Sequence, residues 1–234
     1  MYWKTFYNQR VLELGSGEHL RQVGHTENGL PISDAHAKAL SDQIITALAL
    51  SPEDDVLDLC CGNGFFTRRL ANQVRSVLGA DISEELIQVA RQDHGAANIT
   101  YGVHDACEVA SLSAPEGRGF SKIVLFAALQ HFTVEAFSGM LEGMVHVGTP
   151  DVRIFIGFIP DVEKQDLFYG TEERRQMHER HIAAGTDSFG KWWSQDALRV
   201  AAVQHGLTCR FTDLPEGLLA ASYRFNAVLD RPAS

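Results

Sequence analysis

Residues 56–64 read VLDLCCGNG, a short apolar run that contains an acid and ends in two glycines one residue apart. Such a run is typical of a buried strand, and the glycines let the chain turn tightly where the strand ends. Helical spacing follows at Phe65, Phe66, Leu70 and Val74. A strand, a glycine turn and a helix in this order direct free N–H groups toward a ligand, so the stretch predicts a ligand-binding turn.

A second stretch, VLELGSGEH at residues 11–19, has the same arrangement of apolar residues, acid and glycines. It continues as HLRQVGHTENGLPIS over residues 19–33, which adds two glycines and a proline. This continuation predicts a loop and no helix, so the N-terminal stretch is interpreted as a chance look-alike.

Strands and helices alternate outward from residues 56–64. Helices are expected after the capping residues Ser33, Ser83 and Ser194, and over residues 133–147 by their apolar spacing. Seven strands are expected at residues 56–60, 75–80, 98–103, 121–127, 152–159, 207–213 and 222–229. This alternation predicts an α/β fold with a doubly wound, mostly parallel seven-stranded sheet. The last two strands have no helix between them and should therefore be antiparallel.

Three acids fall at or near the ends of successive strands: Asp58 in the first, Asp81 at the tip of the second and Asp105 after the third. A dinucleotide fingerprint needs a third glycine, but Gly62 and Gly64 are followed by Thr67. A carboxylate at Asp58 would also repel a phosphate. A ligand with a ribose and a positive charge therefore fits better.

These features together resemble the class I S-adenosylmethionine-dependent methyltransferases: an acid in the first strand, a glycine turn, acids after the second and third strands, and an antiparallel final pair. The resemblance covers roughly residues 33 to 230. It implies the Rossmann-like methyltransferase fold, S-adenosylmethionine as cofactor and S-adenosylhomocysteine as product.

The resemblance assigns the first strand and its turn to the methionine end of the cofactor. Asp58 would help orient the ammonium group, and Gly62 and Gly64 would let the backbone approach closely. Cys60 lies in the same turn and is counted as a cofactor contact. Cys60 and Cys61 depart from the family, in which small residues or glycine are common there, which narrows the turn.

The second, third and fourth strands are assigned to the nucleoside end. Asp81 would accept the two ribose hydroxyls, and Ile82 would pack on the adenine. Asp105 would bind the adenine amino group, with the Ala106 N–H near the ring, and Phe126 would line the pocket. Each residue has an ordinary structural alternative: a carboxylate satisfied by backbone amides, a helix cap, a loop residue or, for Phe126, core packing.

His131 follows the fourth strand and is the candidate catalytic residue. Methyl transfer from a sulfonium needs an aligned nucleophile, and a base only if that nucleophile holds a proton. A histidine can take such a proton near neutral pH. The alternative is a structural histidine held by the turn at Thr133. His25, His104 and His178 are lesser candidates.

Two segments outside the predicted sheet should control access and specificity. Residues 1–32 are expected to form an N-terminal lid or substrate cap, and residues 33–234 the methyltransferase domain, with a cap insertion at 160–193 after the fifth strand. Both segments carry aromatic residues that could cover a cleft from two sides: Tyr2, Trp3, Phe6, Tyr7, Phe168, Tyr169, Phe189, Trp192 and Trp193.

Composition limits the remaining possibilities. A net charge of −10 over 234 residues argues against nucleic-acid binding and favours a small neutral or cationic substrate. No apolar run approaches the length of a membrane span, and the N-terminus has no export signal, so a cytoplasmic protein without membrane contact is expected. No metal site is expected, because residues 178–181 read HERH and lack the spacing of a zinc-protease helix.

The sequence therefore predicts an S-adenosylmethionine-dependent methyltransferase that acts on the oxygen or nitrogen of a small molecule, such as a sugar or natural-product biosynthetic intermediate. Two alternatives remain open. A nicotinamide-dependent oxidoreductase would share the sheet, and a non-catalytic S-adenosylmethionine-binding module would share the cofactor residues. The acceptor and the oligomeric state are not encoded in any pattern of the sequence.

Overall fold

The computed structural model describes residues 2–184 and 189–232. Met1, residues 185–188 of the predicted insertion and residues 233–234 lie outside the described residues. Within the described part of the chain, no helix has the length and apolar character needed to cross a membrane.

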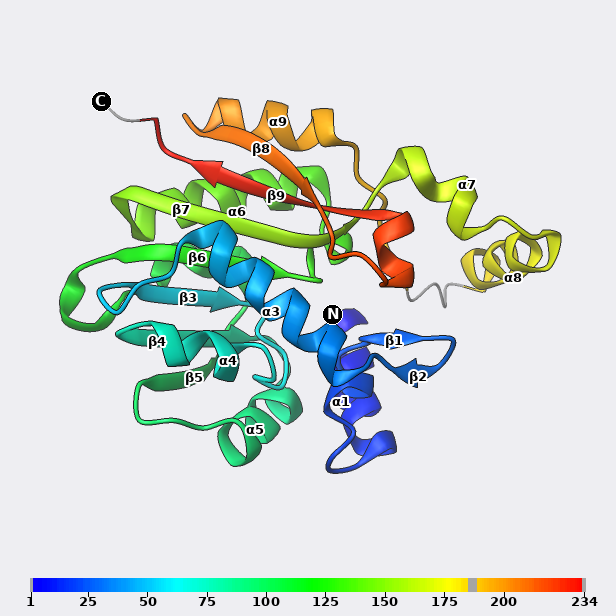
Figure 1. Ribbon diagram of the computed structural model, residues 1–234, viewed down its shortest axis with the longest axis horizontal. Coiled ribbons are helices and arrows are strands. Elements are labelled where there is room, and N and C mark those ends of the chain that lie inside the picture. Colours follow the sequence, from blue (N-terminus) through cyan, green and yellow to red (C-terminus); the bar gives the residue numbers. More distant parts are fainter. Residues whose placement is uncertain (1, 185–188, 233–234) are drawn as a thin grey trace.

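A seven-stranded sheet in the order β5-β4-β3-β6-β7-β9-β8 forms the centre of the molecule (Figure 1). Its strands are β3 (Asp55–Leu59), β4 (Ser76–Asp81), β5 (Ile99–Val103), β6 (Phe120–Phe126), β7 (Gly148–Pro160), β8 (Thr208–Asp213) and β9 (Arg224–Asp230). The first five pair in parallel, whereas β9 is antiparallel to both β7 and β8. The predicted doubly wound sheet with an antiparallel last strand is confirmed.

Helices cover both faces of the sheet (Figure 1). The helices that cover the sheet are α3 (Asp34–Leu48), α4 (Thr67–Leu70), α5 (Glu84–Asp93), α6 (Val134–Val147) and α9 (Gln195–Gln204). The side chains of Ser33, Ser83 and Ser194 cap α3, α5 and α9 as predicted, and Thr133 caps α6. The helix after the glycine turn is shorter than expected, because the chain is already extended at Val74.

Alternate residues along the strands bury opposite faces, which gives two main cores. On one face, strand residues such as Leu57 and Ile123 pack with α6 and α9. On the other face, Val56 and Val124 pack against Ile44 of α3. Burial on both faces explains why these strands are continuous apolar runs and fixes the positions of their carboxyl ends.

The N-terminal segment differs from its prediction. Residues 11–14, the start of the look-alike stretch, are helical within α1 (Tyr2–Leu14), so they form no strand. The expected loop over residues 19–33 was wrong in part, because it contains α2 (His19–Gln22) and the hairpin of β1 (Thr26–Glu27) and β2 (Leu30–Pro31). Tertiary contacts hold this short helix: the buried Gln22 amide donates to Gly15 O and accepts from Asn63.

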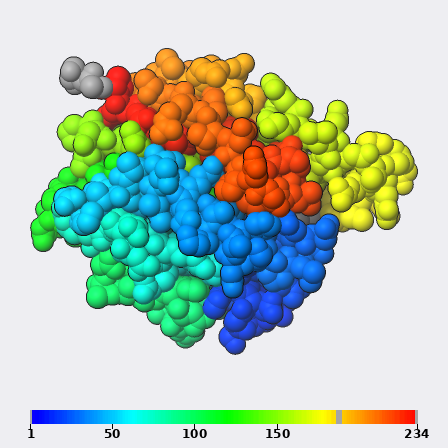
Figure 2. Space-filling model, viewed as in Figure 1, coloured from blue at the N-terminus to red at the C-terminus, as the bar shows by residue number. Residues whose placement is uncertain are grey.

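The insertion after β7 is helical where it is described. It contains α7 (Gln165–Phe168) and α8 (Glu172–Ala183), and α8 buries no residue, as predicted for a solvated helix around His178 and His181. Figure 2 shows α8, in yellow, projecting from the body of the molecule. The N-terminal segment and the insertion both lie at the end of the sheet toward which the arrows of β3 and β4 point (Figure 1).

Candidate functional site

A cavity of about 330 Å³ opens at the carboxyl ends of β3, β4, β5 and β6. Nine of the ten residues predicted from the sequence line it: Asp58, Cys60, Gly62, Asp81, Ile82, Asp105, Ala106, Phe126 and His131. Gly64 is the exception. It has a φ of +79°, and a Cβ there would lie 2.5 Å from the hydroxyl of Tyr101, so its position requires glycine for packing.

Asp58 is buried in β3, and its carboxylate accepts a hydrogen bond of 2.6 Å from the hydroxyl of Thr67. Burial raises its pKa to about 7, Thr67 partly opposes that shift, and the nearby charge of Asp81 adds to it. A positively charged group beside this carboxylate would favour its ionised form. The site therefore suits a cation here.

Asp81 ends β4 and connects two backbone turns. Its two carboxylate oxygens accept 2.9 Å hydrogen bonds, one from Gly62 N and the other from Ser83 N. Burial raises its pKa, whereas these backbone donors lower it. A carboxylate has about four acceptor positions, so Asp81 keeps capacity for two further donors.

Asp105 follows β5 and caps the short helix of residues 106–111, since its Oδ1 accepts from Cys107 N at 2.9 Å. Phe126 ends β6 and stacks on the ring of His25, with 5.4 Å between ring centroids and 11° between planes. Each of the three acids thus makes a local structural hydrogen bond while also facing the cavity. The functional and structural interpretations of these residues are compatible.

His131 contacts two aromatic residues of the N-terminal helix that were not predicted from the sequence as its neighbours. Its Nε2 lies 3.0 Å from the hydroxyl of Tyr7, and its ring centroid lies 3.9 Å from that of Trp3, both in α1. Its buried Nδ1 has no hydrogen-bond partner among the described residues. Burial, with a smaller effect of the charge on Arg224, lowers the pKa of His131 to about 3. The imidazole is therefore neutral near pH 7 and has a lone pair available.

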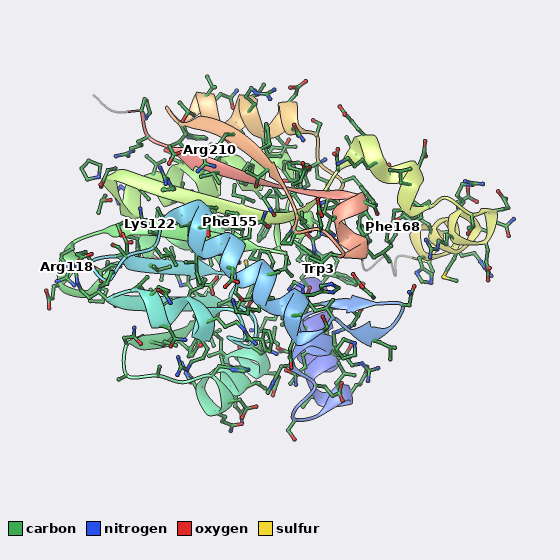
Figure 3. The ribbon with its side chains drawn as sticks, viewed as in Figure 1. Trp3, Arg118, Lys122, Phe155, Phe168 and Arg210 are labelled. Carbon is green, nitrogen blue, oxygen red and sulfur yellow. The ribbon has the colours of Figure 1, made fainter. Side chains whose placement is uncertain are left out.

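A second cavity, of about 540 Å³, adjoins the first. The two share their boundary residues: Tyr7, Val23, His25, Ala127 and His131. The second cavity is otherwise lined from α1, the hairpin, the insertion and the segment that precedes β9. Trp3 lines the first cavity and Phe168 the second. Both lie at one end of the sheet, whereas Arg118 and Lys122 lie at the other end (Figure 3).

Three of the residues that line these cavities have a positive φ although they are not glycine, and each lies at or near the end of a strand. They are Cys60 after β3 (φ 60°), Ala127 after β6 (φ 55°) and Phe158 near the end of β7 (φ 64°). Such conformations are uncommon for side chains with a Cβ and cluster at ligand sites. These backbone conformations are an observation separate from the acids, and they indicate a ligand site at the same carboxyl end of the sheet.

Part of the predicted aromatic cover belongs to the core. Trp193 is 1% exposed and packs on Phe137, so it does not line either cavity. Trp3 and Tyr7 line the first cavity, and Phe6, Phe168 and Tyr169 line the second. The N-terminal segment therefore lines both cavities, whereas the described residues of the insertion line only the second.

Comparisons with known proteins agree with this fold. Residues 56–151 match the family model described as a methyltransferase domain. The chain is 27% identical over 240 residues to chondramide synthase cmdD of Chondromyces crocatus, a match that covers 98% of this chain and 6% of the relative. It is 34% identical over 91 residues to a 23S rRNA (uracil(1939)-C(5))-methyltransferase, RlmD, of Methylococcus capsulatus, which covers 38% of this chain and 20% of the relative. The chain thus spans a small part of the length of these relatives.

Solved structures share the fold over nearly the whole chain. Magnesium protoporphyrin IX methyltransferase of Synechocystis PCC 6803 with bound SAH has a TM-score of 0.67 at 15% identity, covering 98% of both chains. The DhpI-SAM-HEP complex has a TM-score of 0.64 at 18% identity, covering 97% of this chain and 95% of the other. Residues 56–151 therefore match a methyltransferase-domain family, and the chain has the class I methyltransferase fold, as predicted.

Proposed function

We propose that this chain transfers the methyl group of S-adenosylmethionine to an oxygen or nitrogen atom of a small-molecule acceptor, such as a sugar or natural-product intermediate. The observation that carries the proposal is the pair of cavities with a common boundary at His131 and Tyr7. A methyltransferase needs two such compartments, one for the methyl donor and one for the acceptor, which meet where the methyl group passes.

The first cavity would hold the cofactor. Asp58, in the first strand, would face the methionine ammonium, and Asp81 would use its remaining acceptor positions for the ribose hydroxyls. Asp105 and Ala106 would bind the adenine edge, and Ile82 would pack on its face. The buried acids fit a ligand that carries hydroxyl donors and positive charge, and they disfavour phosphate. When bound, the cofactor supplies a methyl group already activated by the sulfonium.

His131 would act at the boundary between the cavities. Its neutral ring can accept a proton from a hydroxyl or amine acceptor, and Tyr7 can hold its orientation through the 3.0 Å contact. The low pKa makes it a weak base in the empty site, so most of the rate would come from alignment of the two substrates. Residues 1–32 and 160–193 would serve as lid and cap over this boundary.

The second cavity supports a small acceptor. Its 540 Å³ lies within the range typical of small-molecule sites. The net charge of −10 also opposes a polyanionic partner. The RlmD relatives, named for an rRNA substrate, match only 38% and 47% of this chain.

Calorimetry with S-adenosylhomocysteine and NAD tests the cofactor assignment. We expect S-adenosylhomocysteine to bind and NAD not to bind. Asp81→Ala should weaken S-adenosylhomocysteine binding by about 2 to 3 kcal/mol, because two hydroxyls lose a charged acceptor. Asp196→Ala, which removes an exposed aspartate of α9, is the matched control and should leave the affinity unchanged.

Preferential binding of NAD, or unchanged affinity in a folded Asp81→Ala variant, would contradict the assignment. Catalysis is tested separately with methyl-labelled S-adenosylmethionine and a panel of small hydroxyl and amine acceptors. Transfer of the label to any acceptor distinguishes an enzyme from a module that only binds the cofactor.

A further inference from the structure

Arg224 is a buried cation with no acidic partner in the described part of the chain. It is the first residue of β9, is 6% exposed and lines the second cavity. Among the described residues, the groups that favour its ionised form are the phenols of Tyr223, which also hydrogen-bonds to it, and Tyr7, and neither is a carboxylate. A guanidinium without a counter-ion is costly to bury. Such a residue is retained where a ligand can supply the missing negative charge.

The contacts of Arg224 hold its guanidinium in place without satisfying it. One terminal nitrogen donates to the carbonyl of Phe158, whose ring centroid lies 4.5 Å from the guanidinium carbon. The rings of Phe189 and Tyr223 lie 5.0 and 5.5 Å away. Its buried Nε has no hydrogen-bond partner among the described residues. The planar group is thus positioned by aromatic rings and keeps a donor available.

The surrounding cavity is locally cationic although the whole chain is acidic. Its described lining contains three arginines, Arg10, Arg174 and Arg224, and one acid, Glu27. The carboxylate of Glu27 accepts from the backbone N–H of Leu219, so it does not pair with an arginine there. Net charge favoured a neutral or cationic acceptor, but most of that charge is exposed, and exposed charges farther from the cavity than a screening length of about 8 to 10 Å are largely screened by salt.

The size of the charge indicates which anion fits. Arg224 alone of these arginines is buried, whereas Arg10 is half-buried and Arg174 exposed. Arg10 and Arg174 also donate to backbone carbonyls, of Arg21 and Phe168. One buried guanidinium balances one negative charge, and its fork of donors matches a planar carboxylate. A phosphate dianion would need a second buried cation.

We propose that the acceptor carries a carboxylate that Arg224 binds, while an aromatic or apolar body packs against the rings of Phe6, Phe168 and Phe189. This inference rests on the proposed function, because it takes the second cavity as the acceptor site. The charge of Arg224 also acts on His25 and His131 at the boundary between the cavities. A carboxylate held by Arg224 therefore leaves the methyl-accepting atom of the same molecule free to face His131.

The experiment compares three ligands that share a 4-hydroxyphenyl ring, on the full chain saturated with S-adenosylhomocysteine: 4-hydroxyphenylacetate, its neutral amide and 4-hydroxyphenyl phosphate. Calorimetry should show that the carboxylate binds at least about tenfold more tightly than the amide, with an affinity in the millimolar range or better. Arg224→Gln should abolish this preference, and Arg224→Lys should retain part of it. Arg210→Gln, an exposed arginine of β8 in Figure 3, is the matched control and should retain all of it.

Equal binding of acid and amide, no binding of the acid at about 10 mM, tighter binding of the phosphate, or a preference that survives Arg224→Gln each overturns the proposal. The wild-type comparison stands even if Arg224→Gln fails to fold. S-adenosylhomocysteine binding is measured independently, and the acid and amide titrations are repeated without it. Loss of cofactor binding with a retained carboxylate preference would reject the proposed function alone.

Discussion

At the scale of single residues, the contact between Tyr7 and His131 connects the N-terminal helix to the boundary between the two cavities. The hydroxyl and the imidazole are 3.0 Å apart, although 124 positions separate them in the chain. Burial raises the pKa of Tyr7 and lowers that of His131 to about 3, so both are neutral near pH 7. A neutral pair can orient an acceptor without placing another positive charge beside the sulfonium, and the imidazole can take up the acceptor's proton as the sulfonium becomes a neutral thioether.

His131→Ala tests the role of this pair. If His131 is the base, the variant should bind the cofactor normally and lower kcat by about 10² to 10⁴. The deficit should shrink as pH rises, because the acceptor then loses its proton to solvent. The measurement is labelled-methyl transfer to the acceptor found in the panel, as a function of pH, with the exposed His146→Ala of α6 as control. Joint loss of cofactor binding and thermal stability would instead identify His131 as structural.

At the scale of elements, residues 1–32 cover the sheet edge without joining the sheet. Lys4 of α1 pairs with Glu84 of α5 at 2.6 Å, a contact of two partly exposed groups that contributes little stability. Val23 contacts the glycine turn, since a Cβ at Gly62 would lie 2.8 Å from its Cγ1. The segment therefore closes the first cavity, while the two main sheet cores contain none of its residues.

Truncation before residue 33 should separate these roles. We expect the shortened chain to keep its near-UV circular dichroism, because both sheet cores are retained. It should bind S-adenosylhomocysteine more weakly than the full chain, because Tyr7, Val23 and His25 no longer enclose the cavity. Loss of the near-UV signal would show that residues 1–32 are part of the core that folds cooperatively.

At the scale of the whole molecule, buried ionisable groups couple stability to pH in opposite directions. Burial, with a smaller effect of the charge on Arg224, lowers the pKa of His25 to about 3. The unfolded chain therefore binds more protons than the folded chain between about pH 3 and 6.5, so this histidine reduces stability as pH falls below about 6.5. Asp58 has the opposite effect, because its pKa of about 7 in the folded chain exceeds the unfolded value. Burying its ionised carboxylate lowers the free energy of unfolding at high pH, and this loss decreases as pH falls through about 7.

A substitution at His25 measures how much this histidine contributes to the pH dependence of the unfolding free energy. Between about pH 7 and pH 5, the wild-type chain should lose about 2 kcal/mol more of its unfolding free energy than His25→Leu does. Urea unfolding at the two pH values measures the difference. His146→Leu, at an exposed position of α6, should keep the wild-type dependence on pH. Identical slopes for the wild-type chain and His25→Leu would rule out the buried neutral histidine as a source of acid sensitivity.

Local sequence patterns were sufficient to predict the sheet, the order of strands and helices along the chain, and the acids at the carboxyl ends of the strands. Capping serines and apolar periodicity act over a few residues, and parallel strands bring their carboxyl ends to one edge. Asp58, Asp81 and Asp105 could therefore be placed together before any coordinates were known. The single-turn α2 was missed because its helical state depends on contacts of Gln22 with distant groups.

The groups that face these acids across the cavities are placed by long-range packing. Tyr7 reaches His131 and Val23 reaches the glycine turn because α1 and the hairpin fold back across the sheet. Arg224 reads in the sequence as an ordinary polar residue at the start of a strand, yet packing against Phe158 buries its guanidinium in the second cavity. No local pattern encodes these contacts, because they join segments tens to more than a hundred residues apart and arise from the fit of complementary surfaces.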